Sequence, residues 1–265
     1  MPKIKVNDIN IYYEVYGEGF PCVMIMGTAL CLKVWDDPLI DELSKRFKTI
    51  LFDNRGAGQT EVPEGEYTIK MMADDTAGLM DALNIEKAHV IGVSMGGMIA
   101  QELVLNYPEK VEKLVLWGAN CGGRKTIPPT MAAFKFYLGA IEGLTPERMA
   151  KATIPLLLTP EFMKNNPDYV EDKIQRILSG PIPFSSYARQ LKAMIGLNTY
   201  RRLKDINTPT LIMQGKKDIV VPPENGEILT GQIPGAKLVI FEKSGHAIFP
   251  HEPELFLNTL LEFLA

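Results

Sequence analysis

The chain has 265 residues, of which 46% are hydrophobic and 23% charged, a balance that excludes a disordered protein and allows one large domain with an insertion. The formal net charge of −4 disfavours nucleic acid as a partner, because a protein that neutralises many phosphates is normally basic. No stretch approaches the ~18 apolar residues of a membrane span, and the first residues hold no signal-peptide run, so we expect a cytoplasmic protein without membrane contact.

The first predicted elements are two short antiparallel strands. Ile4 and Val6 lead to a turn, after which Ile9, Ile11 and Tyr13 alternate with polar residues. From residue 22 the pattern changes to continuous apolar runs, which are typical of strands buried on both faces. The runs cover residues 22–26, 49–52, 88–93, 111–117, 210–213 and 237–241.

Amphipathic helices are predicted between these strands. They cover approximately residues 36–47, 69–83, 95–107, 223–232 and 253–264. Strands that alternate with helices predict βαβ units, and therefore an α/β fold whose mostly parallel sheet has helices on both faces.

Residues 122–203 interrupt this alternation. They contain no convincing strand and hold 8 of the 19 prolines, which divide the segment into short helices. A structureless loop of this length is improbable inside a compact domain. We therefore predict an inserted helical lid at residues 122–203, over a core domain formed by residues 1–121 and 204–265.

The run at residues 88–93 ends in Gly92-Val93-Ser94-Met95-Gly96, and a helical pattern follows. A serine on a tight strand-to-helix turn has a strained backbone, and small residues two before and two after it are needed to avoid collisions. The helix N-terminus then favours negative charge that develops beside the hydroxyl. This spacing predicts Ser94 as a nucleophile.

A serine nucleophile needs a base, usually a histidine that a carboxylate orients. His246 follows the last predicted strand, at the carboxyl edge of the sheet, where open α/β sheets bind their ligands. His89 enters the strand that carries Ser94 and lies too far away, so we expect a structural role. His251 precedes Pro253, and we expect it to serve the start of the terminal helix.

The carboxylate is expected between the serine and the histidine in chain order. Asp218 follows the strand at 210–213 on a loop at the carboxyl edge. Asp205 precedes that strand and would lie at the opposite edge, whereas Asp53 comes before the serine and fits turn chemistry. The strand that ends at Trp117 is followed by no carboxylate, so Asp218 is the predicted acid.

Acyl transfer also needs two donors for the oxyanion, and the loss of one typically costs ~10²–10³ in rate. The N–H that follows the nucleophile belongs to Met95. The second donor is expected from the loop after the strand at 22–26, where Gly27 allows the turn and the Thr28 N–H is the candidate.

Cysteine and histidine usage indicates neither a disulfide framework nor a metal site. Cys22, Cys31 and Cys121 are few and unevenly spaced, so we expect buried reduced thiols. No Cys/His cluster has metal-ligand spacing, and we expect neither metal nor cofactor.

Taken together, these motifs resemble the α/β-hydrolase superfamily over the whole chain apart from residues 122–203. The elbow around Ser94, the turn at 53–58, Asp218 and Gly245-His246 occur in the family's order and spacing. The resemblance implies an eight-stranded sheet and cofactor-free Ser-His-Asp acyl transfer. Met26 stands where many relatives have histidine. The 26–28 loop with Trp35 is similar to that of 3-oxoadipate enol-lactonases, within the esterase and lactonase branch.

The function predicted from these residues is hydrolysis of a small carboxylic ester or lactone through an acyl-serine. The alternatives are C–C bond hydrolysis, perhydrolysis or lyase chemistry on the same triad, and a non-enzymatic small-molecule receptor. Apolar residues such as Phe134, Phe136, Tyr137 and residues 156–158 could line a pocket, although their helical spacing favours lid core. Arg124, Lys125 and Arg189 could hold a substrate carboxylate, although solvated surface charges are the simpler interpretation. The oligomeric state cannot be read from the sequence.

Overall fold

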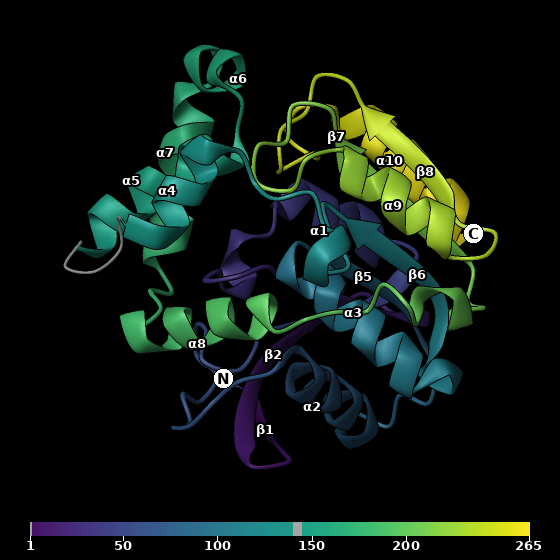
Figure 1. The fold of residues 1–265 in the computed structure, drawn as a ribbon. Helices are drawn as coiled ribbons and strands as arrows, with labels where there is room; N and C mark the ends of the chain where they lie inside the picture. Colours follow the sequence, from purple (N-terminus) through teal and green to yellow (C-terminus); the bar gives the residue numbers. More distant parts are fainter. Residues whose placement is uncertain (1, 140–144) are drawn as a thin grey trace.

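An eight-stranded sheet forms the centre of the structure, a computed structural model that describes residues 2–139 and 145–265 (Figure 1). Its strand order is β1-β2-β4-β3-β5-β6-β7-β8, and all pairings are parallel except β1 with β2 and β2 with β4. The predicted eight-stranded, mostly parallel α/β sheet is thus confirmed. The strands are β1 (Lys3–Val6), β2 (Ile9–Tyr16), β3 (Phe20–Ile25), β4 (Phe47–Phe52), β5 (Ala88–Val93), β6 (Val111–Trp117), β7 (Thr210–Gly215) and β8 (Lys237–Phe241).

The helices predicted between the strands are also confirmed, with no boundary more than three residues from its prediction. They are α1 (Asp37–Ser44), α2 (Ile69–Ala82), α3 (Met95–Asn106), α9 (Glu224–Gln232) and α10 (Pro253–Leu264). In the described part of the chain, no helix combines the length and the apolar character that crossing a membrane would require.

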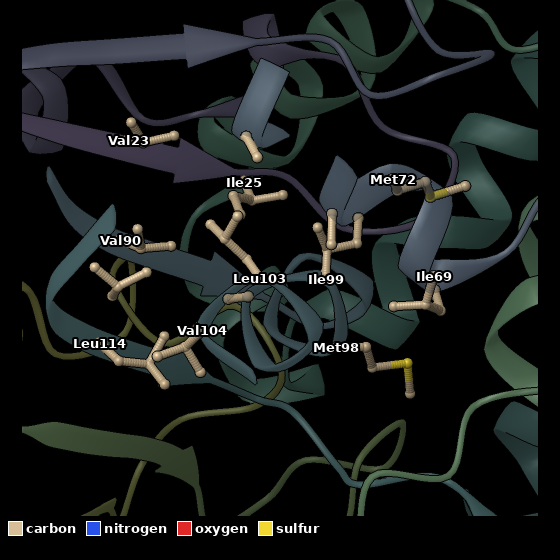
Figure 2. Close-up of a cluster of buried hydrophobic side chains, with 14 of the residues drawn as sticks. Val23, Ile25, Ile69, Met72, Val90, Met98, Ile99, Leu103, Val104 and Leu114 are labelled. Carbon is tan, nitrogen blue, oxygen red and sulfur yellow. The ribbon is translucent and has the colours of Figure 1, made fainter. Parts of the chain in front are cut away.

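Both faces of the central strands are buried, and alternate residues of such a strand serve opposite layers. On β3, Val23 and Ile25 pack in the cluster that contains residues of α2 and α3. Figure 2 shows the Ile25 side chain near Ile99 and Leu103 of α3. Cys22 and Met24 of the same strand belong to the second cluster, with residues of α1 and α10. This double burial explains why the strands appear in the sequence as continuous apolar runs.

Residues 122–203 follow β6 and lead back to β7. Their described part contains five α-helices and no strand, and a single bridge pairs Gly122 with Asn198 at the two ends. The helices are α4 (Met131–Gly139), α5 (Pro146–Leu157), α6 (Pro160–Asn165), α7 (Pro167–Leu178) and α8 (Phe184–Ile195). Ala150, Ile154, Leu158 and Ile174 form a small separate core between α5 and α7, whereas Ala193 of α8 joins the larger cluster that contains residues of α2 and α3.

Candidate active site

Ser94 occupies the turn between β5 and α3 in a conformation that non-glycine residues rarely adopt. Its φ is 57° and its ψ −119°. A Cβ added to Gly92 would lie 2.3 Å from the Gly96 oxygen, and one added to Gly96 would lie 2.0 Å from the Ile25 oxygen. Both contacts are impossible, so only glycine fits at either position. These collisions are the steric reason for the glycines two residues before and two residues after Ser94, as the sequence pattern implied.

The loop that follows β3 packs directly against the elbow. A Cβ added to Gly27 would lie 3.2 Å from the Ser94 Cβ. The loop is held by the Asn54 amide, which donates to the Met26 oxygen at 2.8 Å, and by the Ala29 N–H, which donates to Gln190 Oε1 at 2.9 Å. The loop therefore has a fixed position relative to the serine.

The two N–H groups predicted for the oxyanion hole belong to Thr28, on this loop, and to Met95, at the first position of α3. Neither N–H has an acceptor among the residues that the structure describes. Free donors beside a serine can accept negative charge that develops on a substrate oxygen. Their role in binding an oxyanion stays a prediction.

Asp218 and His246 lie on the loops after β7 and β8, and the structure brings them together. His246 Nδ1 is 2.6 Å from Asp218 Oδ2, and both side chains are almost completely buried. The other carboxylate oxygen accepts the N–H groups of Val220 and Val221, each at 2.8 Å. Because a carboxylate only accepts, Nδ1 is the donor of this hydrogen bond, and Nε2 makes no hydrogen bond to the residues that the structure describes.

Three residues that the sequence did not single out hold this pair in place. The Trp117 indole N–H donates to the His246 oxygen at 3.0 Å, and the Gln214 amide donates to Asp218 Oδ2 at 3.2 Å. Gly118 has a φ of +54°, and a Cβ there would lie 3.0 Å from His246 Cε1. Trp117 ends β6 and Gly118 follows it, and β6 lies between the strands that lead to Ser94 and Asp218. This position at the carboxyl end of the middle strand was the signal in the sequence that could have identified them.

Ser94 and His246 face the same cavity, but no hydrogen bond joins them, and Ser94 Oγ donates to no residue in the described ranges. Hydrogen bonds between a nucleophile and its base are often long before substrate binds. The arrangement therefore combines a buried histidine–aspartate pair with a serine that faces the same cavity as the histidine.

The two other histidines lie outside this arrangement. His89 packs between Phe20 and Phe47 at the start of β5, and burial lowers its pKa to about 4. His251 does not serve the start of α10, which was the expectation. Its Nδ1 donates to the Ala247 oxygen at 2.7 Å, and its Nε2 accepts the Thr159 N–H at 3.2 Å. Because of these bonds, it links the His246 loop to the 122–203 segment.

Asp53 and Asp205, which were not chosen as the acid, also lie outside this arrangement. Asp53 accepts the N–H groups of Leu32 at 2.7 Å and Gln59 at 2.8 Å, as turn chemistry requires. Burial raises its pKa. Asp205 lies in the short turn before β7. In the described ranges, no three His, Cys, Asp or Glu side chains form a group that could hold a metal.

The cavity has a volume of about 330 Å³ and is roofed by residues from α5, α7 and α8. Leu156, Leu157 and Leu158 line it. Leu157 and Leu158 also pack in the core of the helical segment, whereas Leu156 packs against the cluster of Ala133, Val220 and Val221. Arg124, Lys125 and Arg189 do not line it. The side chains of Phe136 and Tyr137, also considered for a pocket, lie outside the described residues, and Phe134 is exposed.

Comparison with known proteins identifies a family and several proteins that are similar over nearly the whole chain. The family model of the alpha/beta hydrolase fold matches residues 21–253. A protein of Azorhizobium caulinodans that bears the name carbamate hydrolase RutD is 28% identical over 99% of this chain and 98% of its own. An enol-lactonase from Burkholderia xenovorans LB400 superposes with a TM-score of 0.86 and 26% identity over 99% of both chains. A thermophilic esterase from Thermogutta terrifontis gives a TM-score of 0.83 and 27% identity, over 100% of this chain and 98% of its own.

Proposed function

This chain belongs to the α/β-hydrolase family, in its esterase and lactonase branch, and we propose on that premise that it hydrolyses carboxylic esters or lactones through an acyl-serine on Ser94. The observation that carries the proposal is the buried His246–Asp218 pair, whose 2.6 Å contact lies at the cavity that Ser94 enters from the elbow. The family and the names of its relatives support an enzyme of the hydrolase class. The bond that it cleaves and the roles of these residues are our proposal.

Acylation begins when Ser94 Oγ attacks the substrate carbonyl carbon while His246 Nε2 takes the hydroxyl proton. Asp218 keeps the ring in the tautomer whose Nε2 is unprotonated, and its charge stabilises the imidazolium that forms. The tetrahedral intermediate then collapses. Its bond to the leaving oxygen breaks, and His246 gives that oxygen the proton, which leaves an acyl-serine and a free alcohol.

The N–H groups of Thr28 and Met95 would bind the tetrahedral oxygen. Both belong to segments with fixed positions, because the loop after β3 is held by Asn54 and Gln190 and the elbow is constrained by its glycines. Donors that need no rearrangement stabilise charge at the moment when it develops. The positive end of the α3 dipole adds to this stabilisation.

Deacylation repeats these steps with water as the nucleophile. His246 Nε2 takes a proton from water, the hydroxide adds to the acyl carbon, and the C–O bond to Ser94 breaks as the serine recovers its proton. The products are a carboxylic acid and the regenerated enzyme. The chain's own groups carry every proton transfer.

We propose that residues 122–203 act as the lid of this site and that residues 1–121 and 204–265 form its core domain. Support comes from the cavity wall, to which α5, α7 and α8 contribute together with Ser94 and His246. A lid that supplies the wall would determine which acyl group fits, while the core supplies the chemistry.

A hydrolysis screen tests the proposed function directly. The substrates are 4-nitrophenyl esters from acetate to octanoate, followed by lactones of graded ring size, with Ser94→Ala as the matched control. We expect the wild type to release product from at least one ester or lactone and the variant to release none above background. Absence of turnover in both classes would contradict the proposal and favour the receptor alternative.

Carbamate hydrolysis is a second candidate, favoured by the name of the RutD relative, which aligns over nearly its whole length. A carbamate presents a similar carbonyl to the serine, and its carbamoyl-serine would be hydrolysed by the same route. Parallel assays of 4-nitrophenyl acetate and 4-nitrophenyl N-methylcarbamate separate the two. A higher kcat/KM for the carbamate would mean that carbamates, and not esters, are the preferred substrate class.

A further inference from the structure

One ion pair in the cavity wall has no part in the proposed mechanism. Lys173 of α7 and Asp36, which precedes α1, both line the cavity. The Lys173 side chain is only 5% exposed and that of Asp36 14%. Lys173 Nζ donates to Asp36 Oδ1 at 2.9 Å and to the Val34 oxygen at 2.9 Å. A buried ammonium in the wall of a binding site affects any substrate that carries charge.

The carboxylate of Asp36 has a second donor on α7. The Tyr169 hydroxyl donates to the same Oδ1 at 2.7 Å, and the Lys173 ammonium lies 5.1 Å from the centre of the Tyr169 ring. Burial and the neighbouring Asp36 charge raise the pKa of Tyr169, which keeps the hydroxyl protonated as a donor. The ammonium is therefore compensated by a carboxylate that is itself fixed in position.

Lys173 is the only lysine among the described residues that line the cavity, and no arginine lines it. The Arg189 guanidinium donates to the Pro63 oxygen at 2.9 Å, and the Lys125 ammonium stacks over Tyr200. The sequence of residues 140–144 contains neither lysine nor arginine. A substrate carboxylate would thus meet a cation that already has its counter-charge.

We propose that Asp36 is a specificity-determining residue. By neutralising Lys173, it makes the cavity select uncharged, apolar acyl groups and reject acyl groups that end in a carboxylate. This inference rests on the proposed ester hydrolysis and names the substrate class of that site. A carboxylate in this cavity would lose its hydration beside the Asp36 charge without gaining a free cation, whereas an alkyl group would contact Leu156, Ile177 and Phe184.

Two esters of similar shape test the proposal. Mono-4-nitrophenyl glutarate ends in a carboxylate, and 4-nitrophenyl 5-methylhexanoate ends in an isopropyl group of the same outline. We expect the wild type to have a kcat/KM at least about tenfold higher for the neutral ester, after subtraction of spontaneous hydrolysis. Asp36→Asn should shift the ratio of the two kcat/KM values toward the anionic ester by about tenfold or more, because Lys173 loses its counter-charge.

Two further variants separate this effect from damage to the lid. Asp37 is the adjacent carboxylate, pairs with Arg176 of α7 at 2.6 Å and does not line the cavity. Asp37→Asn removes a contact to the same helix, and we expect it to leave the substrate ratio unchanged. Lys173→Gln leaves Asp36 without its cation and should shift the ratio further toward the neutral ester. This variant still tests the proposal if Asp36→Asn does not fold.

A binding assay keeps the test independent of turnover. The chain's two tryptophans, Trp35 and Trp117, both line the cavity, so their fluorescence reports on its occupancy. The probes are N-methyl-5-methylhexanamide and the mono-N-methylamide of glutaric acid. We expect tighter binding of the neutral amide by the wild type and a loss of this preference in Asp36→Asn.

The two proposals fail in different ways. If no ester is turned over but the neutral amide is preferred, ester hydrolysis is wrong and the selection by Asp36 stands. Equal wild-type kcat/KM values for the two esters, or equal affinities for the two amides, would overturn the role of Asp36. The same shift in Asp36→Asn and Asp37→Asn would overturn it as well.

Discussion

The carboxyl edge of the sheet and the 122–203 segment are held in place by different kinds of contact. At the sheet edge, backbone atoms pack so closely that glycine is required, and the Ser94 N–H donates to the Trp117 oxygen of the next strand at 2.8 Å. The 122–203 segment is attached mainly through side chains. Ser186 Oγ donates to the Gly56 oxygen at 2.8 Å, and the Gln190 amide donates to the Arg55 oxygen at 3.0 Å.

This difference suggests a division of work between the two regions. Backbone-determined positions tolerate no adjustment, which suits groups that must meet a transition state. Side-chain attachments can change one at a time without loss of the fold, which suits a wall that selects substrates. We therefore expect substitutions at the sheet edge to affect turnover and those in the cavity roof to affect substrate preference.

Ser94→Ala should have the largest effect. Without the nucleophile we expect a loss of roughly 10³-fold or more in kcat/KM, while the fold is kept because only one oxygen is removed. Ester hydrolysis and thermal unfolding, measured on the same preparation, check both parts. A variant with near-normal turnover would exclude Ser94 as the nucleophile.

His246→Ala should be similarly inactive, because the base is lost, and His251→Ala serves as its control. His251 makes its hydrogen bonds to Ala247 and Thr159, so its loss should leave kcat/KM within about tenfold of the wild type. Steady-state kinetics on one ester compare the pair. The reverse order of activities would mean that the wrong histidine was assigned.

Gly118→Ala tests whether close packing fixes the imidazole. The new Cβ would lie 3.0 Å from His246 Cε1, and displacement of the ring should lower kcat by about 10²-fold. Gly65→Ala is the matched control, since Gly65 also has a positive φ, 96°, but open space around its Cβ position. Equal losses of activity in the two variants would attribute the effect to backbone strain instead of contact with His246.

Phe184→Ala tests the cavity roof. This side chain lines the cavity but is 46% exposed, so its removal should change relative kcat/KM values for short and long acyl esters several-fold with little change in melting temperature. The comparison variant in the sheet, Phe52→Ala, should cost about 3–5 kcal/mol of stability because Phe52 is fully buried. The division of work would be wrong if Phe184→Ala lowered stability as much as Phe52→Ala and left the ester preference unchanged.

His89 provides the smallest effect, at the opposite edge of the sheet. Burial, aided by Lys113, lowers its pKa to about 4, whereas unfolding returns it to its ordinary value of 6.5. The unfolded chain therefore takes up the proton first, and folding stability falls as the pH drops from about 6.5 to 4. The total loss should be at most about 3 kcal/mol. Denaturant unfolding across this pH range should show that the free energy of unfolding depends less steeply on pH in His89→Gln than in the wild type. An unchanged pH dependence would contradict the lowered pKa of His89.

The elements most accessible to prediction were those that backbone geometry dictates. The strands appear as apolar runs because both of their faces are buried, and the elbow appears in the sequence because only glycine fits on either side of Ser94. Asp218 and His246 could be chosen because they follow β7 and β8, whose carboxyl ends meet at one edge. Their roles in catalysis stay predictions.

The contacts of the helical segment could not be predicted in the same way. The Lys173–Asp36 pair joins residues 137 positions apart, and either side chain alone resembles an ordinary surface charge. His251 was interpreted from its neighbour Pro253, whereas its partner Thr159 lies 92 positions away. Such pairings depend on how α6 and α7 lie over the core, and no local sequence pattern predicts this arrangement.

The central claim is that Ser94 is a nucleophile activated by His246 and Asp218. Covalent trapping with diethyl 4-nitrophenyl phosphate tests this claim most directly. The organophosphate should transfer one diethylphosphoryl group to the protein and release one equivalent of nitrophenol. Peptide mass spectrometry should place the group on Ser94, with no labelling in Ser94→Ala and much slower labelling in His246→Ala. Stoichiometric labelling at another residue, or full inactivation with Ser94 unmodified, would contradict the account.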